Sequence, residues 1–167
     1  MNTRKIISFF LAAVVVSVIF VGIPLLFISL NNYFGLPVYT SIYFKIIGSV
    51  LLIAGLSIVI YSTILHIKTG RITPLPVIEQ PKQFIVHGLY NYCRNPMYLA
   101  EVVVFLGLFF LLGYVLLLLY PLLAFLTIHI FVVYVEEPEL KRVFGEEYVR
   151  YTTNVSRWIP NKATSEQ

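Results

Sequence analysis

The longest uncharged stretch of the chain sets the first limit on its fold. Residues 102–135 contain no Asp, Glu, Lys or Arg, and apolar sequence already begins at residue 97. As a single helix, residues 97–135 would be about 60 Å long, twice the roughly 30 Å thickness of a bilayer's hydrocarbon core. The stretch therefore predicts a hairpin of two membrane helices. Its turn is expected near Gly113 and Tyr114, with Tyr120 and Pro121 as the alternative position.

Two further apolar segments precede this hairpin, and 59% of the 167 residues are hydrophobic while only 12% are charged. A soluble domain of this length is rarely so apolar. The first segment runs from about Ile6 to Leu30, with a kink expected at Pro24, and is too long for the apolar core of a signal peptide. The second runs from about Ser41 to Leu65. The expected fold is all-α: a polytopic membrane protein with about four transmembrane helices.

The distribution of basic residues predicts how these helices are oriented. With four spans, the basic residues near the start, in the middle loop and in the tail fall on one side, and Lys45 falls on the other. By the positive-inside rule that side is the cytoplasm, so both termini are expected to be cytoplasmic in an inner or plasma membrane. The basic residues are scattered and form no run that would follow a phosphate backbone, so no nucleic acid is expected as a partner.

The second apolar segment carries a stripe of small side chains at every seventh residue: Ser41, Gly48, Gly55 and Ser62. Small residues let helix backbones approach closely in lipid, where no hydrophobic force drives helix association. The stripe is expected to pack against another helix of the same chain. A homodimer face is the alternative.

Polar segments flank the hairpin on both sides. Residues 66–97 are rich in proline, glycine and charge and predict a functional interfacial loop. From Glu136 onward the tail is expected to form one amphipathic helix, with Leu140, Val143 and Tyr148 on its apolar face. Trp158, near the end of that tail, is an aromatic of the kind found at membrane interfaces.

Five polar residues bracket the hairpin: Arg94, Asn95, Glu101, Glu136 and Glu137. Because the hairpin returns the chain to the side from which it started, Arg94 is expected to lie close to Glu136 or Glu137. Charges at membrane depth are costly and tend to be paired or functional. A purely structural Arg–Glu pair and a functional site both remain open. Glu101, seven residues after Arg94, is expected on the same helix face, one turn inside the apolar run.

Metal and nucleotide chemistry find no support in the sequence. The histidines, His66, His87 and His129, share no metal-ligand spacing, and the single cysteine, Cys93, excludes an internal disulfide and a thiolate cluster. No metal site is expected, and Cys93 is interpreted as a small apolar filler. His129 precedes Glu136 by seven residues and is a candidate for the same side of the helix, with a packed or hydrogen-bonded histidine as the alternative.

The segment GRITPLPVIEQPKQFIVHGLYNYCRNPMYLAE resembles the signature of the integral-membrane methyltransferases, which include isoprenylcysteine carboxyl methyltransferases and bacterial proteins similar to phospholipid N-methyltransferases. The pattern is G-x-x-TP-x-P, an apolar pair before G-x-Y, and R-[HN]-P-x-Y. It continues after the hairpin with EE-x-x-L, FG-x-x-Y-x-x-Y and W-I-P. The ordered set covers about residues 68–160. The chain is therefore divided into an N-terminal two-helix membrane region, 1–67, and a methyltransferase region, 68–167.

The resemblance implies an S-adenosylmethionine site at the cytosolic face, formed by the loop, the hairpin and the C-terminal helix. Arg94 and Glu136 are the implied catalytic residues, and Glu101 and His129 are candidates for contact with the substrate. A carboxylate at Glu136 suits the cofactor's ammonium group, and Arg94 suits its carboxylate. The implied cofactor contacts are Gln83, Phe84, Ile85, Val86, Tyr90, Asn95, Pro96, Met97, Tyr98 and Glu136.

Two departures from the family pattern bear on the acceptor. Asn95 stands where many carboxyl methyltransferases have histidine, and Val132 stands where they have an arginine that resembles a contact to the substrate's carboxylate. The sequence therefore favours methyl transfer to another lipid-like or lipophilic acceptor that enters from the bilayer. An isoprenylcysteine-type carboxyl O-methyltransferase is the alternative within the family. A non-catalytic membrane scaffold or small transporter that kept the fold is the alternative of another class.

Overall fold

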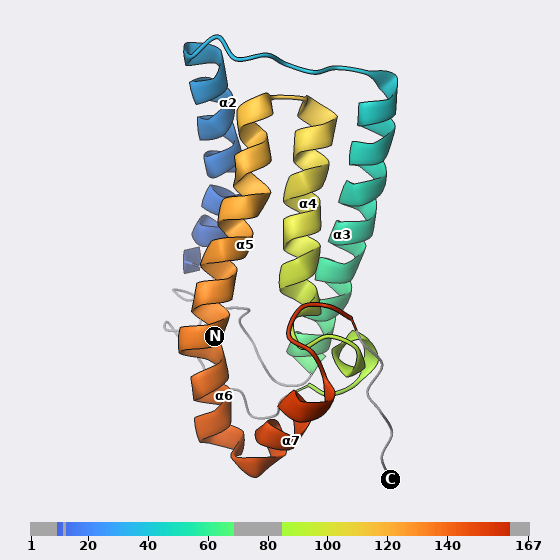
Figure 1. Cartoon of the computed structure of the whole chain (residues 1–167), viewed down its shortest axis with the longest axis vertical. Coiled ribbons are helices and arrows are strands. Elements are labelled where there is room, and N and C mark those ends of the chain that lie inside the picture. The colour runs from blue at the N-terminus through green and yellow to red at the C-terminus, as the bar shows by residue number, and fades with distance from the viewer. Residues whose placement is uncertain (1–9, 12, 69–84, 161–167) are drawn as a thin grey trace.

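The computed structural model describes residues 10–11, 13–68 and 85–160, and this part of the chain is all-α. Four long helices lie side by side in a bundle (Figure 1). They are α2 (Ile23–Tyr33), α3 (Ile42–Lys68), α4 (Pro96–Leu112) and α5 (Leu119–Phe131). In Figure 1 their spatial order is α2, α5, α4, α3, so that the hairpin of α4 and α5 lies between the first two helices.

Three helical stretches are long and apolar enough to cross a membrane: Ala13–Tyr33, Ile42–Lys68 and Val115–Phe144. The remaining apolar helix, α4, has 17 residues and is therefore about 25 Å long. The all-α membrane architecture is confirmed with three long spans, and the fourth expected span corresponds to this shorter helix. The first two spans also continue further than expected, to Tyr33 rather than Leu30 and to Lys68 rather than Leu65.

The hairpin turns where the sequence predicted it. Helix α4 ends at Leu112, and Gly113 follows with a φ of 76°, in the left-handed region that favours glycine. A Cβ atom at Gly113 would also collide with the backbone of Tyr39, whose N–H donates to the Gly113 carbonyl at 2.8 Å. The alternative turn at Tyr120 and Pro121 is wrong, because both residues lie in the first turn of α5, where a proline is tolerated.

The stripe of small residues on α3 packs against α4. A Cβ atom at Gly48 would lie only 2.8 Å from the Gly107 carbonyl oxygen, and one at Gly55 would meet the α4 backbone in the same way. Ser62, further along the stripe, is fully buried, whereas Ser41 precedes the helix and is exposed. Packing within the chain is therefore confirmed. Because α4 covers the stripe, it is not a homodimer face.

The irregularity expected at Pro24 is present as a π-helical turn, η1 (Val18–Gly22). In a π-helix each N–H bonds to the carbonyl five residues earlier, so the Ile19 carbonyl would await an N–H at residue 24. Proline has none. The Tyr120 hydroxyl on α5 instead donates to the Ile19 carbonyl at 2.6 Å. The same tyrosine ring packs on Phe105 of α4, with centroids 4.3 Å apart, so it joins three helices.

Asn31 joins the first span to the hairpin turn. The sequence places it in a short turn, yet α2 continues through it and its side chain is 0% exposed. Its Nδ2 donates to the Leu36 carbonyl at 2.9 Å, and its Oδ1 accepts the Leu116 N–H at 3.0 Å. Leu116 lies in η3 (Val115–Leu118), whose first N–H groups have no partner within the helix. Asn31 therefore serves as a distant cap for η3.

The tail is two helices rather than one. Helix α5 continues through a π-helical turn, η4 (Val132–Glu136), into α6 (Glu137–Phe144). Gly145 then has a φ of 55° and a ψ of −130°, and α7 (Glu146–Asn154) begins on its other side. The expected single amphipathic helix is therefore wrong, because this glycine adopts a backbone conformation that ends a helix. As a result α7 turns back toward the segment that precedes α4 (Figure 1).

Candidate functional site

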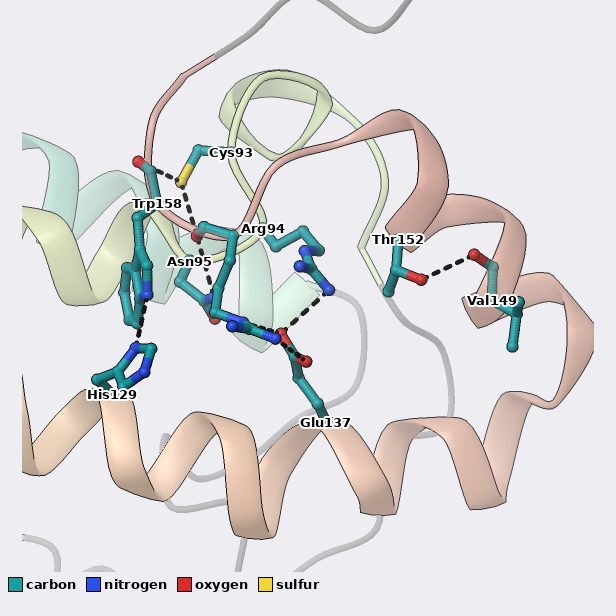
Figure 2. A network of polar contacts seen from close by, with 9 residues as sticks. Cys93, Arg94, Asn95, His129, Glu137, Val149, Thr152 and Trp158 are labelled. Carbon is teal, nitrogen blue, oxygen red and sulfur yellow. Dashed lines mark hydrogen bonds and ion pairs between the residues drawn. The ribbon is translucent and has the colours of Figure 1, made fainter.

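The three residues before α4 bind the segment that follows α7. The Arg94 N–H donates to the Ser156 carbonyl at 2.9 Å, and the Asn95 Nδ2 donates to the Arg157 carbonyl at 3.2 Å. The Cys93 thiol lies 3.3 Å from the same Arg157 carbonyl oxygen (Figure 2). Segments more than sixty residues apart in the chain are thus held side by side at one end of the bundle.

Cys93 has a role beyond filling space. Burial raises the pKa of its thiol, although its hydrogen bond to Asn95 and the charge of Arg94 act in the opposite direction. The thiol therefore stays protonated and donates its hydrogen to the tail. The interpretation of Cys93 as a buried small residue is confirmed, but its bond to the tail is not evident from the sequence.

Glu137 lies at the centre of a cluster of ion pairs. Its Oε1 is 3.0 Å from Arg94 Nη1, and its two oxygens accept Arg157 Nε at 2.7 Å and Arg157 Nη2 at 2.9 Å (Figure 2). The side chains of Arg94 and Glu137 are only 12% and 16% exposed. The predicted pairing of Arg94 is confirmed, with Glu137 rather than Glu136 as its partner. Two guanidinium groups share one carboxylate, which leaves an excess positive charge.

Arg157 was not predicted as a site residue. It forms a bidentate pair with Glu137, and this hydrogen bonding raises the pKa of its guanidinium. The one signal for it in the sequence is its position directly before the W-I-P motif.

One atom of Arg94 is left without a partner. Its Nε is buried and has no hydrogen-bond partner among the residues that the structure describes. Buried donors are nearly always satisfied, and an unsatisfied one costs about 1–3 kcal/mol. The cluster therefore combines an excess positive charge with a free donor, which together suit an anionic ligand group.

Glu136 faces a different partner from its neighbour. The Tyr98 hydroxyl, in the first turn of α4, donates to Glu136 Oε2 at 3.0 Å. Glu136 is the last residue of η4, while Glu137 begins α6, so adjacent carboxylates point to different parts of the cluster. Two residues that the resemblance implies as cofactor contacts, Tyr98 and Glu136, are thus in direct contact.

Tyrosines extend the cluster toward Tyr90 in η2 (Gly88–Asn91), which is also buried. The Tyr151 hydroxyl donates to the Tyr90 carbonyl at 2.7 Å, and the Tyr148 and Tyr151 rings lie 6.2 Å apart. Burial raises the pKa of Tyr148 to about 12; Glu137 and Glu136 act in the same direction and Arg94 opposes them. Burial also raises the pKa of Tyr151. Both phenols therefore remain neutral at physiological pH.

The other predicted cofactor contacts are placed unevenly. Ile85 and Pro96 are buried, Met97 is partly buried and Val86 is exposed. Gln83 and Phe84 lie outside the described residues. Asn95 is near the cluster, and its Nδ2 is engaged by the tail.

The expectation that Arg94 and Glu101 share a helix face is wrong. Helix α4 begins at Pro96, and Asn95 before it has a φ of −125° and a ψ of 53°, outside the helical region. Proline favours the first position of a helix and disfavours helical geometry in the residue before it. Arg94 therefore lies outside α4, and helical spacing does not relate it to Glu101.

His129 binds the tail. The Trp158 indole N–H donates to His129 Nδ1 at 2.9 Å, and both rings pack against Phe125 (Figure 2). The hydrogen-bonded interpretation of His129 is confirmed, while its contact with substrate stays a prediction. The indole of Trp158, expected at the membrane interface, makes its polar contact inside the protein.

Comparison with known proteins agrees with this placement. Residues 43–147, more than half of the chain, match the family model described as phospholipid methyltransferase. No curated protein and no solved structure matches the chain. Members of the matched family are integral-membrane enzymes that use S-adenosylmethionine as methyl donor. The segment before α4, both hairpin helices and the pair of glutamates all lie within the match, and the chain belongs to the phospholipid methyltransferase family.

Proposed function

We propose that this protein transfers a methyl group from S-adenosylmethionine to a lipid-like acceptor at the membrane surface. The observation that carries the proposal is the cluster of Arg94, Tyr98 and Glu136 inside the family match. A scaffold or small transporter would not need these groups to converge. The direct contact of Tyr98 with Glu136 and the buried position of Tyr90 favour an enzyme.

The residues present fit the amino-acid part of the cofactor. Its carboxylate suits the unpaired Arg94 Nε and the excess positive charge around Glu137, and its ammonium suits the carboxylate of Glu136. Tyr90 and Tyr98 offer aromatic faces to a sulfonium or an adenine ring. Arg94 and Glu136 are therefore the residues that we propose for catalysis. The full set of proposed cofactor contacts is Gln83, Phe84, Ile85, Val86, Tyr90, Asn95, Pro96, Met97, Tyr98 and Glu136.

When bound, the cofactor supplies an electrophilic methyl group on a sulfonium. What the protein has to add is alignment and exclusion of water, since methyl transfer is an in-line displacement. The tail contributes to both, because Asn95 and Arg94 bind it over the start of α4. Arg94 and Glu136 orient the reacting groups, and the neutral tyrosines keep their surroundings uncharged.

The family name and the structure both bear on the acceptor. Val132 is 0% exposed, so this position offers neither a cation nor a surface to an incoming carboxylate. This favours a phospholipid or another lipophilic acceptor over an isoprenylcysteine carboxylate. Glu101 and His129 are the residues that we propose on the acceptor side. A labelled-methyl assay separates the two classes, because a methyl ester is released by base and an N-methyl group is not.

We further propose that α4 crosses the membrane as a fourth span and that the site end of the bundle is cytosolic, as are both termini. The described basic residues support this orientation, since Arg94, Lys141, Arg150 and Arg157 lie at the site end and Lys45 lies at the opposite end. The division into regions 1–67 and 68–167 stays a prediction.

The test is binding of S-adenosylhomocysteine to the purified protein in detergent, measured by calorimetry. We expect Glu136→Ala to weaken binding by about 10- to 150-fold, because a charged hydrogen bond contributes about 1.5–3 kcal/mol. Glu146→Gln, at an exposed acid on α7, is the matched control and should bind like the wild type. A wild-type protein that does not bind S-adenosylhomocysteine would refute the proposed function.

A further inference from the structure

Glu101 differs from the other acids that the structure describes. It is half-buried in the second turn of α4, about 7 Å along the helix from Pro96. No described residue forms an ion pair or a hydrogen bond with its carboxylate. The remaining described acids are either bonded or exposed: Glu136 to Tyr98, Glu137 to Arg94 and Arg157, Glu139 to Arg142, and Glu146 and Glu147 on the surface of α7.

Helical spacing places Glu101 beside the candidate site. Tyr98 lies three residues before it and Phe105 four residues after it, so the three share one face of α4. Tyr98 reaches Glu136, and Phe105 packs on Tyr120 of α5. The face of α4 that packs on α3 is a different one. Glu101 therefore lies between the polar cluster and the apolar core of the bundle.

The protein offers this carboxylate little compensation. A charged side chain at membrane depth is costly, and such groups usually pair or mark a functional site. The charge of Glu101 reaches the Tyr120 hydroxyl, but that hydroxyl donates its hydrogen to the Ile19 carbonyl. The missing partner has to come from outside the described protein, and a cation is the complement of a carboxylate.

We propose that Glu101 binds the amine of the acceptor lipid and takes up its proton. This inference rests on the proposed function and specifies its acceptor side. An alkylammonium headgroup first pairs with the Glu101 carboxylate. Proton transfer then gives a carboxylic acid and a neutral amine, whose nitrogen lone pair is free to attack.

The step balances in atoms and charge. The amine nitrogen forms a bond to the methyl carbon while the bond from that carbon to sulfur breaks, and the sulfur leaves as a neutral thioether. The positive charge passes from sulfonium to the methylated ammonium. The proton held by Glu101 returns to water at the nearby headgroup layer. The site should therefore favour headgroups that carry an N–H and disfavour anionic headgroups.

The experiment titrates the purified protein with dihexanoyl-phosphatidylethanolamine, with and without S-adenosylhomocysteine, and follows binding by calorimetry. We expect Glu101→Gln to weaken binding of this lipid about tenfold or more, because one partner of a charged pair is neutralised. Methyl transfer to the same lipid should fall about a hundredfold or more, the usual contribution of a general base. Binding of S-adenosylhomocysteine should be unchanged, which also shows that the variant is folded.

Two controls keep the result specific. Glu147→Gln removes an exposed carboxylate and should change neither measurement, and dihexanoyl-phosphatidylglycerol replaces the amine headgroup by an anionic one. Equal amine-lipid binding and equal methylation by wild type and Glu101→Gln would overturn the role of Glu101 and leave the proposed function intact. A wild type that does not prefer the amine lipid would overturn it as well. The titration without S-adenosylhomocysteine decides on Glu101 even if the cofactor proposal fails.

Discussion

At the end of the bundle that contains the α4–α5 turn, the chain is joined by neutral hydrogen bonds, whereas ion pairs join it at the opposite end. Asn31 binds Leu36 and Leu116 at the first end, and Tyr39 donates to Gly113. At the second end, Glu137 binds both Arg94 and Arg157.

The difference lies in what each end leaves unused. Asn31 is fully buried, and both ends of its amide are satisfied by backbone groups. The ion-paired end keeps an excess positive charge, an unpaired Arg94 Nε and, one turn deeper, the carboxylate of Glu101. Complete satisfaction is typical of structural contacts, and incomplete satisfaction of buried polar groups marks places where a ligand completes the network.

The largest effect is expected at the ion-paired end. Glu137→Ala leaves two guanidinium groups without their shared carboxylate, and removing one member of a buried pair costs about 3–5 kcal/mol. We expect a loss of this size in the free energy of unfolding, measured by denaturant titration in detergent. A loss below about 1 kcal/mol would show that water compensates the arginines and that the two ends differ less than proposed.

A smaller loss is expected at the neutral end. Asn31→Ala leaves the Leu116 N–H and the Leu36 carbonyl without partners, at a cost of about 1–3 kcal/mol. Affinity for S-adenosylhomocysteine should stay unchanged, because this contact lies at the far end of the bundle. Asn32→Ala, at the exposed neighbouring residue, is the control and should unfold like the wild type. A reduced affinity in Asn31→Ala would remove the separation between the two ends.

Tyr120→Phe tests the neutral hydrogen bond between α5 and the first span. It removes the donor to the Ile19 carbonyl while the ring remains, and hydrogen bonds between membrane helices average about 0.6 kcal/mol. The same denaturant titration should show a loss of about this size. Tyr43→Phe, at an exposed tyrosine of α3, serves as the control. No difference between the two variants would mean that the π-turn does not need this donor.

The smallest effect is expected for an ion pair outside the cluster. Arg142 binds Glu139 within α6, and both side chains are exposed far more than those around Glu137. Arg142→Ala should therefore leave the unfolding transition and the binding of S-adenosylhomocysteine unchanged within experimental error. A clear destabilisation would show that charge alone, rather than burial, accounts for the strength of the Glu137 cluster.

The sequence predicts those features that follow from helix length and spacing. The uncharged run is too long for one span, so a hairpin is required, and Gly113 is the residue at its middle that suits a turn. The same hairpin returns the chain to its starting side, which predicts the approach of Arg94 to the two glutamates. The stripe through Gly48 and Gly55 follows from its period alone.

What the sequence does not predict depends on single backbone conformations. Gly145 is compatible with a continuous amphipathic helix until its positive φ is known. In such a helix Arg157 would lie about 30 Å from Glu137, twenty residues away, so their pairing follows only from the reversal at Gly145. Asn31 is equally ambiguous, because nothing in the sequence separates it from its exposed neighbour Asn32.

The π-helical turn at Val132–Glu136 makes chain length part of the site. Each residue of an α-helix turns the chain by about 100°, so deleting one residue here would restore a regular helix and rotate everything after it. Glu137 would then take the place of Glu136, and Tyr98 would still meet a carboxylate. Arg94 and Arg157 would instead face Pro138. A one-residue deletion is thus tolerated by one half of the cluster and not by the other, and residue number between His129 and Glu137 is constrained as strongly as residue identity.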